Sequence, residues 1–148
     1  MSPKRTSGFT LLEVIVVLVI AASAYAVLAS TLFRGASTGD LKAAARNLAS
    51  GLRQAQSTAM TTRRDALLTL DVEAREYQVP GDSEMRRVPA SVDLKLFTAQ
   101  TEVASERKGS IRFYPDGSST GGRITVSSGE RKYLVDVDWL TGRVSIAD

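Results

Sequence analysis

Glu13 is the only charged side chain between Phe9 and Phe33. An acidic side chain at depth in a membrane costs on the order of 2.5–3.5 kcal/mol unless it finds a cation. The apolar run itself contains no Lys or Arg, so the cation has to come from elsewhere. A free α-amino group would serve if the chain were cut just upstream, and Gly8 offers a small residue directly before the run. Such a cut would make Glu13 the fifth residue of the mature chain.

The chain of 148 residues contains no cysteine and no histidine. It therefore has no thiolate nucleophile, disulfide or Cys-ligated zinc, and it lacks the commonest general base and metal ligand. Residues 117–121, with the sequence GSSTG, formally match the nucleophile elbow of serine hydrolases. That motif needs a base histidine and a helix after Ser119, whereas a strand is expected at Arg123–Ser127. We therefore expect a polar hairpin loop, no enzymatic activity and no cofactor.

Two carboxylates, Asp136 and Asp138, alternate along an expected strand, about 6.6 Å apart on one face. That spacing suits a hard cation or an acid–base pair. The alternative is a solvated strand face, since two carboxylates without a third ligand rarely hold calcium. The sequence leaves cation binding open.

The net charge of +3 is unevenly distributed. Residues 34–64 carry six basic side chains against Asp40 alone, a balance of +5, and residues 65–148 carry −3. Basic doublets invite a nucleic-acid interpretation: they are Arg63-Arg64, Arg86-Arg87, Arg107-Lys108 and Arg131-Lys132. Phosphate binding needs a net positive face, so nucleic acid is not an expected partner of the acidic head.

The 25 residues from Phe9 to Phe33 would span about 37 Å as a helix, enough to cross a hydrocarbon core of ~30 Å. Lys4 and Arg5 precede this run on a very short flank. The positive-inside rule then places the N-terminus in the cytoplasm and the rest of the chain on the far side. A secretory signal peptide cut near Ala24 is the alternative, but the apolar run exceeds the ~7–15 residues of a signal h-region.

Residues 8–14, with the sequence GFTLLEV, resemble the class III signal of type IV pilins and type II secretion pseudopilins. A short basic leader precedes them and an apolar helix follows, as in that family. The resemblance implies that a prepilin peptidase cuts between Gly8 and Phe9 and N-methylates Phe9. It also implies that Glu13 engages the N-terminal amine of a neighbouring subunit during fibre assembly.

Beyond the apolar run, residues 34–64 form a predicted stalk helix with a narrow apolar face. That face comprises Leu41, Ala44, Ala45, Leu48, Leu52, Ala55 and Ala59. Short alternating runs then predict strands at Ala66–Val72, Tyr77–Pro80, Ser91–Phe97, Ser110–Tyr114, Arg123–Ser127, Lys132–Trp139 and Arg143–Ile146. In the strand at 132–139, the odd positions, Trp139 included, should face the core, and residues 98–109 should form a loop.

Three head segments are similar to H-type minor pseudopilins, the general secretion pathway protein H family: IRFYPDGSS at 111–119, VDVD at 135–138 and TGRV at 141–144. The resemblance implies an α+β pilin fold, with a long helix packed on an antiparallel, β-sandwich-like head. The implied divisions are a leader at 1–8, a transmembrane and assembly helix at 9–33, a stalk at 34–64 and a head at 65–148.

The same resemblance implies a structural subunit near the tip of a periplasmic secretion pseudopilus. Its partners would be other major and minor pseudopilins, the prepilin peptidase and inner-membrane lipid. The single-pass chain would keep its N-terminus in the cytoplasm and its head in the periplasm. The alternative is a minor type IV pilin of the fimbrial T type, some of which bind DNA through a C-terminal Gly-Arg-x-Arg motif. Residues 142–145 read GRVS and lack the second arginine.

Overall fold

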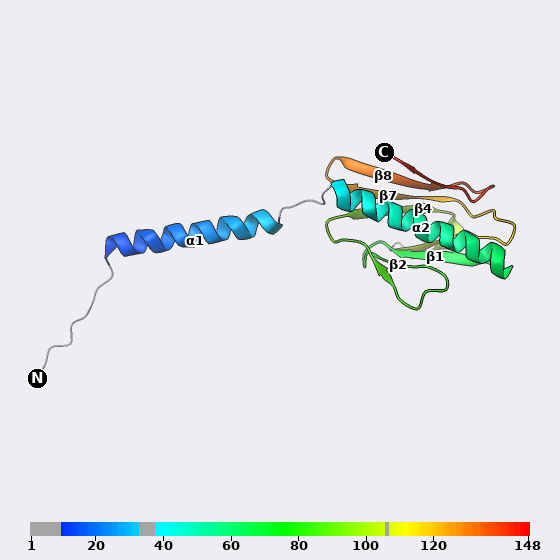
Figure 1. Cartoon of the computed structure of the whole chain (residues 1–148), viewed down its shortest axis with the longest axis horizontal. Coiled ribbons are helices and arrows are strands. Elements are labelled where there is room, and N and C mark those ends of the chain that lie inside the picture. Colours follow the sequence, from blue (N-terminus) through cyan, green and yellow to red (C-terminus); the bar gives the residue numbers. More distant parts are fainter. Residues whose placement is uncertain (1–9, 33–37, 106) are drawn as a thin grey trace, which may run out of the picture. The chain divides into compact units, whose positions relative to one another are not determined.

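The computed structural model describes residues 10–32, 38–105 and 107–148. The chain divides into two units, Met1–Arg34 and Gly35–Asp148, and each is described by itself. In the first unit, helix α1 runs from Leu11 to Leu32 (Figure 1). Its apolar side chains point outward all round the helix, as the exposure of Leu12 (72%) and Ile20 (63%) illustrates. Among the described residues, no helix combines the length and the hydropathy of a membrane-crossing segment.

The second unit begins with α2, which runs from Thr38 to Thr62. The predicted apolar face is buried at every one of its seven positions, and Ala49 and Gly51 are buried with them. Small residues on this face allow the helix to lie close to the strands beneath it. A Cβ on Gly51 would come within 3.0 Å of Val79 and 3.1 Å of Leu68. The helix can therefore lie this close to the strands because Gly51 has no side chain.

Nine strands and one short 3-10 helix follow in the described part of the unit. They are β1 (Ala66–Asp71), β2 (Glu76–Gln78), β3 (Arg86–Arg87), β4 (Asp93–Thr98), η1 (Gln100–Glu102), β5 (Val103–Ser105), β6 (Lys108–Phe113), β7 (Gly122–Ser128), β8 (Arg131–Val137) and β9 (Val144–Ala147). Two antiparallel sheets form, ordered β3-β2-β1-β6-β5 and β4-β7-β8-β9. The fold is therefore α+β, as predicted.

Helix α2 packs across both sheets, with β1 and β8 on either side of its axis in Figure 1. Strand β1 alternates between buried and half-buried residues, because successive side chains of a strand point to opposite faces. Its inward Leu68 and Leu70 join Ile111 and Phe113 of β6 in one core with the α2 face. The second sheet contributes inward residues of β7 and β8: Ile124, Val126, Val135 and Val137.

Two expectations for the head are wrong. Residues 98–109 are not a loop, because they contain the end of β4, η1, β5 and the start of β6. Trp139 is not a core residue either, since β8 ends at Val137 and Trp139 is 65% exposed. The alternation of β8 holds only as far as Val137, after which the chain turns toward β9.

Candidate functional site

The predicted assembly motif lies only partly in the described chain. Gly8 and Phe9 lie outside the described residues. Glu13 lies in the first turn of α1, and its backbone N–H donates to Thr10 Oγ1 at 3.3 Å. Thr10 therefore caps the helix N-terminus, and the sequence TLLE from Thr10 to Glu13 has the spacing of a capping box. A carboxylate in this turn is also favoured by the helix dipole.

The neighbours of Glu13 on α1 are apolar. Leu12, Val16 and Val17 are each about half exposed or more, and within residues 10–32 no basic side chain is available to pair with the carboxylate. The described surface of α1 is therefore apolar on all sides, with one acidic side chain, Glu13, in its first turn. Any cation that pairs with Glu13 would therefore come from outside residues 10–32.

In the head, the segments that suggested H-type pseudopilins meet at one end of α2. Gln56 of α2 donates to Gly117 O at 2.9 Å and to Thr141 O at 3.1 Å, so one amide ties the β6–β7 and β8–β9 connections to the helix. Gly142 lies at φ +62, and a Cβ there would overlap the carbonyl oxygen of Gly117. The conformation and the close approach both require glycine at position 142.

Ser119, the serine of the formal elbow motif, is a structural residue of this cluster of connections. Its side chain is buried, with the whole residue 5% exposed. Its hydroxyl donates to Asp138 O at 3.1 Å and accepts the N–H of Gly121 at 2.9 Å. The hydroxyl therefore joins two connections and is not presented to a substrate.

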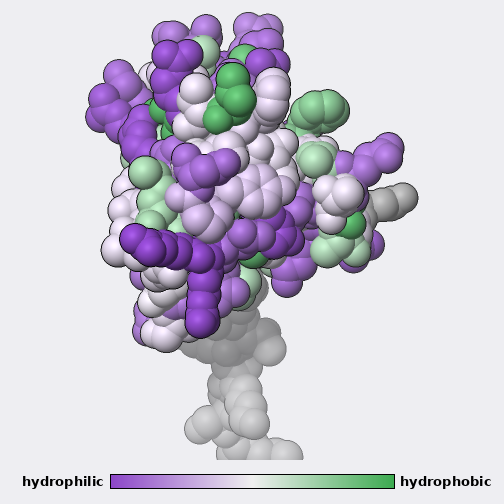
Figure 2. Space-filling view, turned by 90° about the vertical axis from the view of Figure 1, so that its right-hand side faces the viewer, coloured by the Kyte–Doolittle hydropathy of each residue, from purple (hydrophilic) through white to green (hydrophobic). Residues whose placement is uncertain are grey.

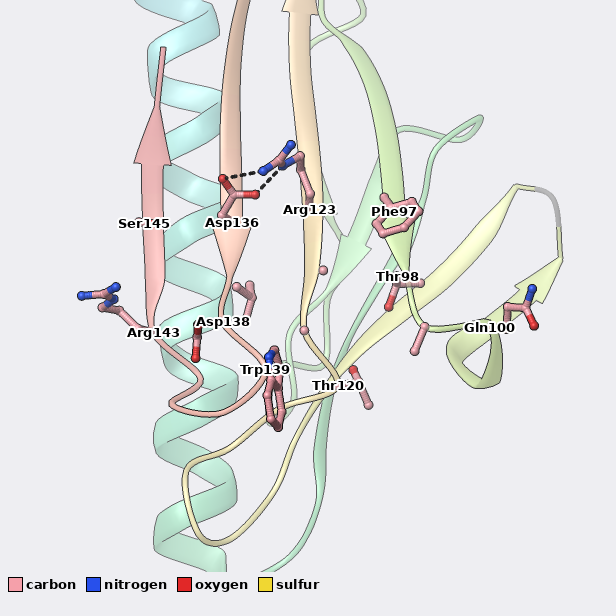
Figure 3. Close-up of a pocket in the computed structure, with 14 residues that line it drawn as sticks. Phe97, Thr98, Gln100, Thr120, Arg123, Asp136, Asp138, Trp139, Arg143 and Ser145 are labelled. Carbon is pink, nitrogen blue, oxygen red and sulfur yellow. Dashed lines mark hydrogen bonds and ion pairs between the residues drawn. The ribbon is translucent and has the colours of Figure 1, made fainter.

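Asp136 and Asp138 do not share a strand face, because β8 ends between them. Asp136 pairs with Arg123 of β7 at 2.5 Å (Figure 3). The Asp138 carboxylate accepts the backbone N–H of Thr141 at 2.8 Å and that of Leu140 at 3.1 Å, and these bonds lower its pKa. In the described part of the chain, no three acidic, His or Cys side chains gather as a metal site would require.

An open depression of about 700 Å³ lies over the outer face of the second sheet, the face turned away from α2 (Figure 3). Phe97 and Trp139 stand at its borders, 78% and 65% exposed, and the Arg123–Asp136 pair lies between β7 and β8. Arg123 and Asp136 neutralise each other's charge in this ion pair. At the end of the head where α2 finishes, the surface is mainly hydrophilic, and hydrophobic residues form small separate patches (Figure 2).

The basic doublets are distributed over different elements and do not form one patch. Arg86 bonds Asp82 at 2.6 Å, and Arg87 bonds Glu76 at 2.8 Å. Arg107 pairs with Glu73 at 2.7 Å, and Arg131 donates to Thr38 Oγ1 at the start of α2. These pairings place acidic or polar groups against four of the eight basic side chains of the doublets.

Sequence reasoning missed the polar contacts that hold the head together. Gln56 carried no signal, because an amide on a helix face is common and its two carbonyl partners lie 61 and 85 residues away. The pair formed by Arg112 and Glu102 was missed as well, since Glu102 was placed in a loop. The pseudopilin-like segments at 111–119, 135–138 and 141–144 were the signal that marked this region in the sequence.

Two family models match the chain. Residues 44–141 match "Type II transport protein GspH", and residues 3–24 match "Prokaryotic N-terminal methylation motif". Among curated proteins, "Type II secretion system protein H" of Xanthomonas campestris pv. campestris is 30% identical over 141 residues, which cover 95% of this chain and 83% of that protein.

Solved structures share the fold. The minor pseudopilin EpsH from the type 2 secretion system of Vibrio cholerae matches with a TM-score of 0.57 at 12% identity, over 73% of this chain and 96% of that one. The type IV minor pilin FimU of Pseudomonas aeruginosa matches with a TM-score of 0.55 at 13% identity, over 74% and 90%. With the GspH model matching about two thirds of its length, the chain belongs to the GspH family of type II transport proteins.

Proposed function

We propose that this chain is a structural subunit near the tip of the periplasmic pseudopilus, acting in protein export across the outer membrane. Membership of the GspH family makes it a minor pseudopilin of type II secretion. The observation that carries the proposal is the joint match of an N-terminal methylation motif and a GspH head in one chain. Association with other pseudopilins follows from the same family membership.

The proposed location is the bacterial inner membrane, with the N-terminus in the cytoplasm and the head in the periplasm. Support comes from the apolar residues 9–33 and from Lys4 and Arg5 before them. The outward apolar side chains of α1 also favour contact with lipid tails or with other apolar helices. In this arrangement residues 1–8 are the leader, 34–64 the stalk and 65–148 the head.

The proposed maturation is cleavage between Gly8 and Phe9 by a prepilin peptidase, followed by N-methylation of Phe9. The carboxylate of Glu13 then pairs with the terminal amine of a neighbouring subunit. The absence of basic residues from residues 10–32 supports a partner from another chain. The amine of Phe9 would lie four residues before Glu13, so an adjacent helix shifted along its axis by about 6 Å would bring its amine level with this carboxylate.

No catalytic role is proposed for the head. Its strongest nucleophile motif holds a buried serine bonded to two backbone groups. Asp138, which the sequence offered as a cation ligand, caps a turn instead. These side chains are used to fix the connections at the end of α2, as a structural subunit requires.

The test is intact-mass analysis of the full chain isolated from inner membranes, together with co-isolation of its partner pseudopilins. We expect a mature chain that begins at methylated Phe9 and that is recovered with other pseudopilins. Gly8→Leu should leave the leader attached. A mature end near Ala24, or a processed chain that never associates with pseudopilins, would overturn the proposal.

A minor type IV pilin is the second candidate function, and the fold likeness to FimU is the observation that favours it. Some minor pilins of the fimbrial T type bind DNA, whereas a secretion subunit is not expected to bind it. Electrophoretic mobility of labelled duplex with the full chain in detergent, at physiological salt, separates them. A tight complex that weakens steeply with added salt would favour a DNA-uptake pilin, whereas a free duplex favours the secretion subunit.

A further inference from the structure

The open edge of β9 carries backbone hydrogen-bonding groups that no strand of the described chain uses. Strand β9 is the last strand of its sheet and pairs only with β8 among the described residues. Asp138 N–H donates to Arg143 O at 3.0 Å, so position 143 faces β8. Ladder bonds alternate along an antiparallel strand, and Ser145 and Ala147 therefore also face β8. The backbone groups of Val144 and Ile146 then point to the open edge.

A contact from α2 confirms this orientation. Arg53 Nη2 donates to Val144 O at 3.2 Å, which requires that carbonyl to point away from β8. Lys42 and Arg46 lie eleven and seven residues before Arg53, and such spacings place residues on one side of a helix. The three cationic side chains therefore follow the same edge of the sheet, where α2 runs alongside β9 (Figure 3).

A groove of about 270 Å³ lies between α2 and the end of this strand. Lys42 and Arg46 line one side, and Tyr133, Ile146 and Ala147 line the other, with Asp148 at its end. Ile146 is 38% exposed in the groove. Neither Lys42 nor Arg46 forms an ion pair with any residue that the structure describes.

Edge strands of soluble proteins are usually protected by being very short, by Pro, by a bulge or by charges, and β9 is short, with four residues. The sequence of β9, VSIA, has no Pro and no charge, and its register with β8 is regular. Such an edge can accept another strand, in which case main-chain bonds supply affinity and side-chain pockets supply specificity. Because Lys42 and Arg46 line the groove beside this edge, they favour acidic side chains on such a strand.

We propose that β9 accepts an extended acidic segment of a neighbouring protein as a fifth strand of its sheet. Lys42 and Arg46 are one helical turn apart, about 6 Å along the axis. Alternate residues of a strand are about 6.6 Å apart on one face. Carboxylates at alternate positions of the added strand therefore match the two cations, while the residues between them point to the opposite face of the sheet.

This inference deepens the proposed function, because it gives the chemistry of one head contact of the subunit. A binding assay with defined peptides tests it without any fibre, so the docking proposal and the subunit proposal can fail separately. The full chain in zwitterionic detergent micelles is titrated with a fluorescent, capped VEVEVEV peptide, and empty micelles correct for partitioning. Two further probes are VKVKVKV and the block peptide VVEEEVV.

Charge reversal supplies the decisive variants. Lys42→Glu with Arg46→Glu should weaken binding of VEVEVEV about tenfold or more, because both attractive contacts become repulsive. The matched control, Lys95→Glu with Lys132→Glu, makes the same change of net charge at exposed positions of β4 and β8. It should leave the affinity within about twofold. Both peptides with altered patterns should bind more weakly than VEVEVEV.

Hydrogen exchange locates the contact. Bound VEVEVEV should slow exchange of the Ile146 amide and leave that of Ser145 nearly unchanged, since Ser145 already bonds to β8. Ile146→Pro removes the edge donor without removing a β8 bond and should abolish binding.

Four outcomes would overturn the proposal: no binding of VEVEVEV, equal binding of VKVKVKV, indifference to the Lys42 and Arg46 changes, or protection elsewhere than the edge. A fifth is slower exchange of the edge amides when dihexanoyl phosphatidylglycerol is added without peptide. That result would mean that Lys42 and Arg46 bind lipid headgroups.

Discussion

The guanidinium of Arg112 lies 2.8 Å from a carboxylate oxygen of Glu102, whose side chain is only 7% exposed. Arg112 projects from β6 and also reaches Asp65 at 3.3 Å, directly before β1. One arginine thus connects η1 to the central strands of the first sheet. Both carboxylates favour its charged form, and its pKa is raised chiefly by the hydrogen bond to Glu102.

The first prediction concerns this ion pair. Arg112→Met should lower the free energy of unfolding by about 2–3 kcal/mol, because it leaves the carboxylate of Glu102 buried without a partner. The double variant with Glu102→Gln should lose less than the single Arg112 variant, since the neutral amide costs less to bury. Urea unfolding of the full chain in detergent, followed by the fluorescence of the single tryptophan, Trp139, measures both. A loss below about 0.5 kcal/mol for Arg112→Met would show that water or Asp65 replaces the contact.

The second prediction separates backbone strain from steric overlap at two glycines. Gly129 and Gly142 have nearly equal φ angles, +61 and +62, but a Cβ on Gly129 meets nothing within 4 Å. Gly129→Ala should therefore cost about 1–2 kcal/mol, the cost of placing a non-glycine residue in the left-handed region. Gly142→Ala should cost clearly more, because the added methyl also overlaps Gly117 O and the Gln56 amide.

The same urea titration provides the measurement for both glycine variants. Gln56→Ala gives an independent check, since it removes two hydrogen bonds but leaves both backbone conformations possible. If both glycine variants lose the same free energy of unfolding, the β6–β7 and β8–β9 connections can move apart at no energetic cost. The Gln56 amide would then have no part in fixing them.

The third prediction is a loss of stability in acid. Thr141 lowers the pKa of Asp138 through its backbone N–H and its hydroxyl, and Ser118 lowers that of Asp116 in the same manner. A depressed folded-state pKa stabilises the fold above the ordinary carboxyl pKa of about 4, and this contribution is lost as the pH falls through the folded value. The urea midpoint should therefore decrease below pH 4. Asp138→Asn should show a shallower decrease, and a slope identical to wild type would assign the acid sensitivity to other groups.

Periodic patterns in the sequence predicted the elements that position these contacts. The seven apolar positions of α2 repeat at three- and four-residue steps, and all of them are buried because one helix face meets both sheets. Strands such as β1 and β7 were located by alternation, which reports burial on one face. These signals depend on local spacing, so the sequence alone contains them.

Features that depend on tertiary contacts were not predictable in this way. Strand β3 has only two residues, Arg86 and Arg87, and its pairing with β2 has no alternating pattern. Glu102 was assigned to a loop because charged residues usually lie in water, whereas Arg112 makes its burial possible. Trp139 was assigned to the core because the alternation continues to it in the sequence. The bonds of Asp138 to Leu140 and Thr141 turn the chain before that residue.

The last prediction concerns Glu13 and rests on the proposed assembly function. Glu13→Gln should leave processing and membrane insertion intact but reduce incorporation into the fibre. Removing the charge makes the helix less costly to hold in lipid by on the order of 2 kcal/mol. Retention in the membrane should therefore be maintained or increased. What is lost is the ion pair with the Phe9 amine of a neighbour, which is worth more in a low-dielectric layer than in water.

Thr10 provides the matched control, because Glu13 contributes to the helix start as well as carrying a charge. Thr10 Oγ1 accepts the Glu13 N–H at 3.3 Å, so Thr10→Val removes the cap, at a cost of about 1 kcal/mol, while keeping the carboxylate. Both variants are compared by co-isolation with partner pseudopilins from membranes, normalised to processed chain. If charge is the essential property, Glu13→Gln fails, Glu13→Asp is intermediate and Thr10→Val assembles nearly as well as wild type. If Thr10→Val fails as badly as Glu13→Gln, the helix start is the essential feature, and the proposed pairing with Phe9 is wrong.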